Sequence, residues 1–507
     1  MADSAPGASE EQVAHSESPA LVWFRDDLRL SDNPALNRAV ASGRPLVFVY
    51  ILDDQSQGIR PLGGAARWML HQSLAALAAA LQHRGGQLLY MRGAAAEAID
   101  WLSRQCGASA VYWNRRYGGA ERALDAGVKV ALSARGVLAE SDNAALLREP
   151  WTIKNQAGEP FRVFSAYWRA CLRTPEVAPP APAPKHLRTF ALSPNIPQRT
   201  ASLADLALEP QKPDWAGGLR QAWPAGELAA QARLADFLDA GLNGYASGRD
   251  RPDKPLTSRL SPYLRFGVIS PRQIWHAVEA ARHAGGKASP ADFDKFLAEL
   301  GWREFSYHLL FHFPDLATRN FQPRFDAFSW RDDASALEAW RRGRTGYPLV
   351  DAGMRELWTT GYMHNRVRMV AASLLIKHLL IDWRKGEEWF WDTLVDADPA
   401  SNAASWQWVA GSGADAAPYY RIFNPVLQGE KFDPDGAYVK RWAPELANLP
   451  PALVHRPWVA SPVELAAAGV RLGHSYPRPI VDHDAARKRA LATLATMNEL
   501  APGASPP

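Results

Sequence analysis

Two hydrophobic patterns divide this chain of 507 residues. Between residues 20 and 145, short apolar runs alternate with segments of helical periodicity, which predicts a parallel sheet joined by right-handed crossovers. From residue 226 onward helical periodicity dominates. The apolar runs lie at 21–24, 45–52, 88–91, 110–113 and 136–139, and the clearest helical segments at 65–84, 227–240, 271–284, 292–310 and 367–380. The sequence therefore predicts an α/β half followed by an all-helical half.

The length and the punctuation of the chain predict how these halves are joined. A chain of this length exceeds one compact core, so we expect at least two domains. Repeated prolines between 173 and 224 remove any periodicity, as in a connector that runs over the surface. The expected parts are a disordered leader at 1–20, an α/β domain at 21–150, a connector at 151–225, a helical domain at 226–490 and a short tail at 491–507.

Composition limits the class of protein. No uninterrupted apolar run reaches about 18 residues, so no transmembrane helix is expected. Two distant cysteines, Cys106 and Cys171, exclude a disulfide scaffold and a Cys-rich metal site, and they fit a reducing cytoplasm. A net charge of +4 permits nucleic-acid binding without indicating it. We therefore expect a cytoplasmic protein, monomeric and without a metal site.

The segment 383–408 contains the most informative side chains. Asp396, Asp398 and Asn402 precede two indoles, Trp406 and Trp408, and 12 of the 20 tryptophans lie after residue 270. Carboxylates, an amide and indoles together suit a bound aromatic cofactor whose electrons pass through indoles. The alternative is a tryptophan-rich core, because aromatic side chains dominate core packing.

Hydroxyl side chains gather at 257–262, just before a proline that can open a helix. Hydroxyls and backbone N–H groups at a helix N-terminus can cradle a phosphate. The alternative is ordinary helix capping by Ser or Thr. Neither GxGxxG nor GxxxxGK[ST] occurs, so a dinucleotide would have to bind by another scheme.

Two helical segments carry charged and polar residues in register. Glu299 and Arg303 are four residues apart and share one helix face, where they could form a simple surface ion pair. Asn365 and Met369 share another face, with Arg366 projecting elsewhere. These could line a pocket open to a polyanion, or they could be a solvated basic helix end. The neighbouring His364 is expected to be structural.

Taken together, these segments resemble the DNA photolyase and cryptochrome family. The resemblance covers most of residues 21–485. Its motifs lie at 21–36, 257–263, 302–305, 345–351, 361–369, 381–384, 406–408 and 421–425. It implies an N-terminal α/β antenna domain, a connector and a helical domain that holds FAD.

The resemblance also assigns residues. Those that match FAD contacts are Tyr245, Thr257, Ser258, Arg259, Leu260, Ser261, Arg303, Arg368, Asp396, Ala397, Asp398 and Asn402. Asn402 matches the residue that faces flavin N5, where an amide could serve both protonation states of N5. Trp406, Trp383 and Trp330 match an electron-transfer chain from the flavin to the surface.

A third group of matches concerns DNA. Trp302, Trp408, Asn365, Met369 and Glu299 match the pocket for damaged bases, and Arg249, Arg366 and Arg421 match phosphate contacts. Glu299 would hydrogen-bond a pyrimidine carbonyl and, with Asn402, is assigned to catalysis. The implied partner is damaged duplex or single-stranded DNA, from which the lesion is flipped out of the stack, a step for which photolyases are a known example.

The implied activity is light-driven repair of cyclobutane pyrimidine dimers by reduced FAD. Asn365 favours this lesion, because the enzymes that repair (6-4) photoproducts carry a histidine there. A cryptochrome photoreceptor stays open, although the short tail favours repair, and so does a flavoprotein electron-transfer enzyme with an unrelated substrate.

A second, light-gathering chromophore is also implied: family members carry a folate such as methenyltetrahydrofolate, a deazaflavin or another flavin there. Gly118 and Gly119 follow Tyr117 where folate-binding members often have a carboxylate. Residues near Trp113, Asn114 and Glu121 are expected to line the antenna site.

Overall fold

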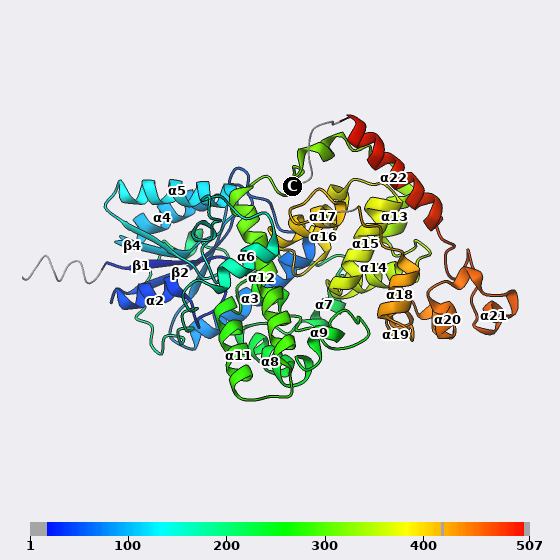
Figure 1. The fold of residues 1–507 in the computed structure, drawn as a ribbon. Helices are drawn as coiled ribbons and strands as arrows, with labels where there is room; N and C mark the ends of the chain where they lie inside the picture. The colour runs from blue at the N-terminus through cyan, green and yellow to red at the C-terminus, as the bar shows by residue number, and fades with distance from the viewer. Residues whose placement is uncertain (1–17, 417–419, 501–507) are drawn as a thin grey trace, which may run out of the picture.

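The computed structural model describes residues 18–416 and 420–500, which form an α/β half and a helical half (Figure 1). The α/β half contains one sheet of five parallel strands in the order β3-β2-β1-β4-β5. The strands are β1 Ala20–Phe24, β2 Leu46–Leu52, β3 Leu88–Arg92, β4 Ala110–Asn114 and β5 Leu138–Asp142. The predicted parallel sheet is confirmed.

The central strands are apolar throughout because helices cover both faces of the sheet. Every residue of β1 and β2 is buried, and Val22 lies in register with Phe48 on one side and Tyr112 on the other. The covering helices are α2 Pro34–Ala41, α3 Gly64–Gln82, α4 Ala95–Cys106 and α5 Gly119–Ser133. Two predicted boundaries shift: β1 already includes Ala20, and β5 begins at Leu138, two residues later than the predicted start at 136.

The connector is more structured than its prolines suggest. Helix α6, Phe164–Leu172, packs against the long helix α12, Pro290–His312. Thr189 bridges to Leu46 and Ala201 to Tyr90, so the chain runs back along the edge of the sheet. The predicted segment 151–225 therefore includes two helices, α6 and α7 Gly217–Ala222, that belong to the helical half, and a strap over the α/β half.

The second half is helical, and its helices often open with proline at the first position, where the missing N–H costs nothing. Besides α12, its helices are α7 Gly217–Ala222, α8 Glu227–Asp236, α9 Tyr245–Gly248, α10 Ser261–Arg265, α11 Pro271–His283, α13 Ala334–Arg341, α14 Pro348–Thr360, α15 Asn365–Ser373, α16 Trp383–Thr393, α17 Ser401–Ala410, α18 Pro425–Phe432, α19 Ala437–Trp442, α20 Pro451–Val454, α21 Pro462–Ala467 and α22 His483–Leu500.

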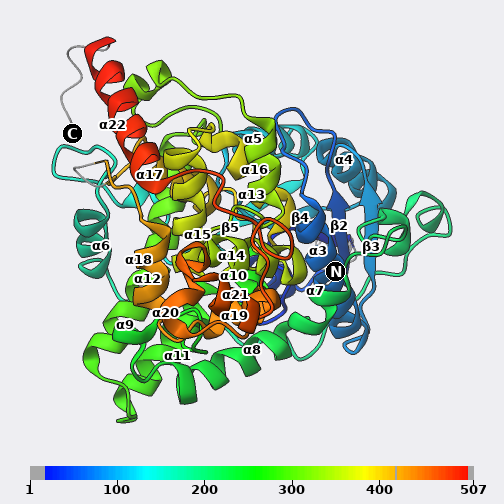
Figure 2. The same ribbon diagram turned by 90° about the vertical axis from the view of Figure 1, so that its right-hand side faces the viewer.

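Two predicted helices end in wider turns. π-helical turns at Phe237–Gly241 and Leu374–His378 follow α8 and α15. The expected limit of the helical domain at 490 falls inside α22, which is continuous from His483 to Leu500. Figure 2 shows α22 crossing the helical half on the side away from the sheet. Within the described residues, no helix is long and apolar enough to cross a membrane.

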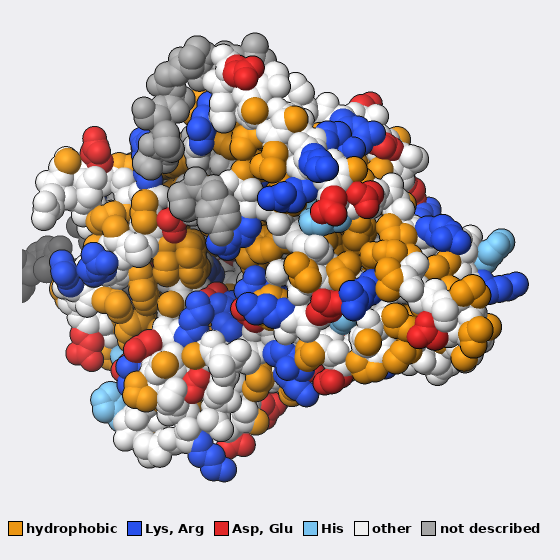
Figure 3. Space-filling model, turned by 45° about the vertical axis from the view of Figure 1, so that its right-hand side comes forward, with side chains coloured by type: hydrophobic (Ala, Val, Ile, Leu, Met, Phe, Trp, Pro, Cys, Tyr) orange, Lys and Arg blue, Asp and Glu red, His pale blue; other side chains and the backbone are white. Residues whose placement is uncertain are grey.

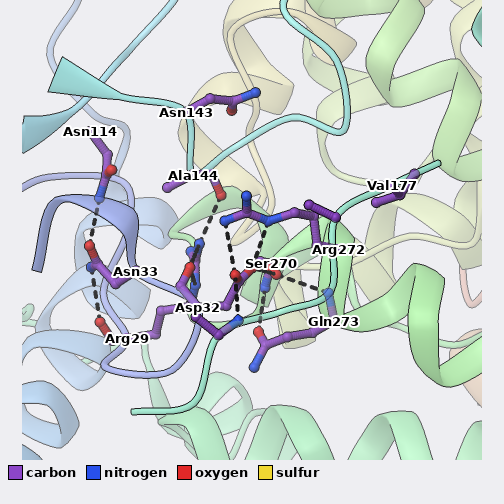
Figure 4. A network of polar contacts seen from close by, with 12 residues as sticks. Arg29, Asp32, Asn33, Asn114, Asn143, Ala144, Val177, Ser270, Arg272 and Gln273 are labelled. Atoms are coloured by element: carbon purple, nitrogen blue, oxygen red, sulfur yellow. Dashed lines mark hydrogen bonds and ion pairs between the residues drawn. The ribbon is translucent and has the colours of Figure 1, made fainter. Parts of the chain in front are cut away.

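A buried polar network joins the two halves (Figure 4). The guanidinium of Arg29, which is fully buried, donates to the carbonyl oxygens of Asp32, Ala144 and Gly267. The carboxylate of Asp32 accepts hydrogen bonds from Ser270 Oγ and Arg272 Nε, both in the helical half. Charged groups are costly to bury unless they are paired, so this network fixes how the halves meet.

Replacing Arg29 with methionine should destabilise the protein strongly. The change leaves three buried carbonyl groups without a donor, which should lower the free energy of unfolding by about 3–5 kcal/mol. The matched control is Arg38→Met, whose side chain is 49% exposed and pairs with Asp142. Denaturant unfolding of both variants measures the difference, and equal losses would contradict the proposed importance of this network.

Candidate functional site

The helical half encloses a cavity of about 580 Å³, a size typical of ligand sites, walled mainly by α10, α12, α15 and α17. Every residue matched to FAD contacts lines it: Tyr245, Thr257, Ser258, Arg259, Leu260, Ser261, Arg303, Arg368, Asp396, Ala397, Asp398 and Asn402. The face drawn in Figure 3 is hollowed near its centre, with Lys and Arg side chains gathered around the hollow.

The hydroxyl side chains at the start of α10 do not cap this helix. Leu260 occupies the N-cap position, and no side chain hydrogen-bonds there as a cap. Ser261 Oγ instead donates to Asp396 Oδ2 at 2.6 Å. The alternative interpretation as ordinary capping is therefore wrong, and Thr257, Ser258 and Ser261 belong to the cavity wall.

Asp396 gives a physical test of whether an organic cofactor fits. Its Oδ2 accepts from Ser261 and from Arg368 Nη2 at 2.9 Å, while its buried Oδ1 has no partner among the described residues. A buried carboxylate oxygen without a partner is costly, so this wall requires an N–H or O–H donor from an occupant. The hydroxyls and guanidinium groups nearby suit phosphates, and the set as a whole fits FAD.

Asn402 is held in one orientation. Its Nδ2 donates to the backbone oxygen of Glu387 at 3.0 Å and to Glu387 Oε1 at 2.8 Å. Both N–H groups are thereby used, which leaves Oδ1 as the free hydrogen-bonding atom of the amide. The expectation that this amide could serve a ring nitrogen in both protonation states is therefore wrong, because only an acceptor is available.

The residues matched to lesion binding line the same cavity: Trp302, Trp408, Asn365, Met369 and Glu299. Two contacts that sequence reasoning missed fix the indoles. Phe164 stacks on Trp302 with ring centroids 3.8 Å apart, and Trp408 Nε1 donates to the backbone oxygen of Asp415 at 3.0 Å. One face of Trp302 is thus covered by Phe164.

The predicted ion pair between Glu299 and Arg303 does not form. Glu299 contacts Arg249 and lies 3.1 Å from Lys295 Nζ. Arg303 Nη1 donates instead to the backbone oxygen of Ala145, in the α/β half. Lys295 lies four residues before Glu299 on the same helix, so spacing could have shown that pair, whereas Arg249 and Ala145 lie on other elements and could not be found from spacing along α12.

The three arginines matched to phosphate contacts differ in their surroundings. Arg249 and Arg366 line the cavity, and Arg366 pairs with Asp250 at 2.6 Å. Arg366 therefore lines the same cavity as Asn365 and Met369, while its guanidinium is directed to Asp250. Arg421 is exposed and does not line the cavity.

The matched indoles lie on different depths of the helical half. Trp406 lines the cavity and packs over Gly386 of α16, the helix that Trp383 opens. Trp383 is buried, whereas Trp330 is half-buried against Phe328. Sequence reasoning missed Phe390 and Trp340, whose rings lie 5.0 and 6.1 Å from that of Trp406. The assignment of Trp406, Trp383 and Trp330 to electron transfer stays a prediction.

His364 has a structural role in this arrangement. Its Nδ1 accepts from the backbone N–H of Arg366, which caps α15. Burial lowers the pKa of His364 to about 4, so the ring is neutral near pH 7. This agrees with the structural interpretation of the sequence.

A smaller cavity of about 190 Å³ lies at the carboxyl ends of β1 and β4, where ligands of open parallel sheets bind. Glu121 lines it, but Trp113 and Asn114 do not. Trp113 Nε1 donates to Asp125, and Asn114 Nδ2 donates to Asn33 Oδ1, so both point into buried structure. The cavity is lined instead by the three residues that follow them in the sequence, Arg115, Arg116 and Tyr117.

Comparison with known proteins decides the family. Residues 20–185 match the model of DNA photolyase, and residues 296–496 match the FAD binding domain of DNA photolyase. A deoxyribodipyrimidine photo-lyase of Agrobacterium fabrum is 52% identical over 95% of this chain and 98% of its own length. The chain belongs to the DNA photolyase and cryptochrome family.

Other family members support the same fold. Cryptochrome-1 of Arabidopsis thaliana is 38% identical over 95% of this chain and 71% of its own length. The crystal structure of a class III photolyase from Agrobacterium tumefaciens has a TM-score of 0.91 and 51% identity, covering 95% of this chain and 98% of that one. An archaeal photolyase from Sulfolobus tokodaii with two FAD molecules has a TM-score of 0.78 and 28% identity, covering 94% and 100%.

Beside the larger cavity, Glu304 of α12 reaches across to the α/β half. Its Oε2 accepts the backbone N–H groups of Leu147 and Arg148, and its Oε1 lies 3.6 Å from Arg303 Nη1. Burial raises the pKa of Glu304 from 4.5 to about 7, although the Arg303 charge opposes this. The carboxyl group therefore loses its proton near neutral pH at the junction of the two halves.

Glu304 should make stability depend on pH. Because its pKa is higher in the folded state, its contribution is fully present below about pH 4.5 and is lost as the pH rises through about 7. Relative to Glu304→Gln, the wild type should lose about 3 kcal/mol of unfolding free energy across this window. Denaturant unfolding at several pH values measures this, with the exposed Glu388→Gln as control; a difference independent of pH would contradict it.

Proposed function

We propose that the protein is a deoxyribodipyrimidine photo-lyase that uses FAD and light to repair cyclobutane pyrimidine dimers in DNA. The observation that supports this best is that one cavity holds both the FAD-matched residues and the lesion-matched residues. A cofactor and a substrate in one cavity can exchange an electron without a carrier between them. The family membership and the 52% identity to a photo-lyase point the same way.

When bound in its reduced form, FAD supplies the light-driven electron that opens the dimer. The chain supplies placement, as is usual for a cofactor enzyme. Ser258, Ser261 and Arg259 would hold the phosphates, and Asp396 would accept a hydrogen bond from the cofactor. Oδ1 of Asn402 would accept one from the N–H of a reduced ring.

The lesion end would act on a dimer flipped from the duplex. Trp302 would offer a base the ring face that Phe164 leaves open, and Trp408 a second aromatic surface. As a carboxylate Glu299 can only accept, so it suits a pyrimidine N–H, while the adjacent Arg249 suits the carbonyl oxygen. This proposal replaces the expected contact between Glu299 and the pyrimidine carbonyl, which was inferred from the family resemblance.

The DNA backbone would be held by charge and without sequence specificity. Arg366 at the cavity and the exposed Arg421 are the candidate phosphate contacts. We propose that duplex and single-stranded lesions both bind, and that the protein acts as a monomer in the cytoplasm. Its two free, buried cysteines, Cys106 and Cys171, suit that compartment.

We propose a second chromophore in the smaller cavity, at the carboxyl edge of the sheet. Tyr50, Arg116 and Glu121 line it with aromatic and charged groups. The archaeal photolyase with two FAD molecules is a structural neighbour in which a second cofactor is present.

The proposed function predicts light-dependent loss of dimers from an oligonucleotide when FAD is reduced. Trp302→Ala should weaken binding of that oligonucleotide about 10- to 100-fold, since stacking on one base is worth about 1–3 kcal/mol. Trp101→Ala, an indole change in the α/β half, is the control. Binding should also weaken steeply with salt. If no dimers are lost under blue light, the result would favour a cryptochrome photoreceptor. If the protein binds undamaged and damaged DNA equally, the result would favour a flavoprotein with an unrelated substrate.

Trp406→Phe should separate photoreduction from repair. If Trp406 passes electrons to the cofactor, the variant should lose light-driven reduction of bound oxidised FAD by at least about tenfold, because phenylalanine is much harder to oxidise than indole. Repair by chemically reduced enzyme should persist. Absorption spectroscopy under illumination measures the first and the oligonucleotide assay the second; unchanged photoreduction would remove Trp406 from the proposed chain.

A further inference from the structure

The segment 60–64 of the α/β half docks on helix α16 of the helical half. Pro61 accepts a hydrogen bond from Trp391 Nε1 at 2.9 Å through its backbone oxygen, and Gly64 N–H donates to Asp392 Oδ1 at 2.8 Å. A Cβ at Gly63 would lie 2.3 Å from the backbone oxygen of Trp391, so only glycine permits this approach. The segment therefore has a defined position against α16.

Arg60 makes the strongest contact of this segment. Its Nη1 and Nη2 donate to Glu387 Oε1 and Oε2, both at 2.8 Å, in a bidentate pair. The guanidinium also lies over the ring of Trp391, 4.2 Å from its centroid. Glu387 is nearly inaccessible, with a side chain 3% exposed, so the arginine is the cation that compensates a buried carboxylate.

Glu387 passes this contact on to the cofactor cavity. Its Oε1 accepts from both Arg60 Nη1 and Asn402 Nδ2, and its backbone oxygen accepts from the same Nδ2. If the Asn402 amide rotated by half a turn, its Oδ1 would face two acceptor oxygens of Glu387, which is unfavourable. A carboxylate kept in place by Arg60 thus determines which atom of Asn402 is available to the cavity.

We propose that Arg60, a residue of the α/β half, is a positioning residue that acts through Glu387 to keep Asn402 as a hydrogen-bond acceptor toward the cofactor. The inference rests on the proposed FAD function and extends it across the domain junction. Arg60 also lines the smaller cavity. The same side chain therefore borders the proposed chromophore site and, through Glu387, supports the Asn402 amide.

The proposal makes a directional prediction about the bound flavin. An acceptor at Asn402 favours the reduced ring, which carries an N–H, over the oxidised ring, which does not. In Arg60→Met, Glu387 loses the cation that keeps its carboxylate in place, so Oε1 is no longer fixed as the acceptor for Asn402 Nδ2 and the amide is freer to turn its Nδ2 toward the cofactor. The midpoint potential of bound FAD should become more negative, with the ratio of reduced to oxidised flavin at a fixed potential falling about tenfold, the worth of one hydrogen bond.

The experiment is spectroelectrochemical titration of FAD bound to the full-length wild type, Arg60→Met, Arg60→Lys and Arg67→Met. Arg67 is the matched control, because it pairs with Asp54 in the same region and does not contact Glu387. Arg60→Lys keeps the charge but not the bidentate geometry, so it should shift in the same direction and by less. It also decides the matter if Arg60→Met fails to fold.

The outcomes separate a positioning role from simple domain docking. A shift in the Arg60 variants with none in Arg67→Met supports the proposal. Equal shifts in Arg60 and Arg67 variants, or no shift in any, overturn it while leaving the proposed function intact. A wild type that takes up no FAD overturns the proposed function, and this inference with it.

Discussion

Buried charge at the junction of the two halves is the constraint on which the rest of the structure depends. Arg29 and Asp32 of the α/β half form hydrogen bonds with the helical half, and Glu304 of the helical half accepts hydrogen bonds from the α/β half. Arg60 forms an ion pair with Glu387 across the same boundary. Each group would be costly to bury alone, and each finds its partners only when the halves meet in one orientation. That orientation therefore also fixes the positions of the side chains that line the cavity.

The larger cavity joins two chemical environments. Asp396, Ser261 and Arg368 give it a polar wall with an unsatisfied carboxylate oxygen. Trp302 and Trp408 give it aromatic surfaces that contacts with Phe164 and Asp415 hold in place. An organic cofactor needs polar partners for its phosphates and ring edge, and the flipped-out rings of a lesion need aromatic surfaces to stack on. A single cavity that offers both therefore suits repair by direct electron transfer.

Much of this could be predicted from local sequence. The alternation of apolar runs with helical periodicity gave the parallel sheet, and the Pro-rich stretch gave the connector, because both depend on residues close together in the chain. The FAD-matched residues came from motifs, and all of them line one cavity. Pairing failed where the true partner is distant: Glu299 lies beside Arg249, 50 residues earlier, and its helical neighbour Arg303 binds Ala145.

The sequence by itself determined the order of the two halves, their secondary structure and the types of side chain available to a cofactor, because periodicity and motif spacing are local properties. Only the tertiary structure decided that Asn402 has both N–H groups engaged, that Phe164 covers one face of Trp302, and that Trp113 and Asn114 do not line the smaller cavity. These outcomes depend on which donors and acceptors remain unused after packing. To know which groups remain unused, one needs the positions of Glu387, Phe164, Asp125 and Asn33, and no local sequence pattern supplies these positions.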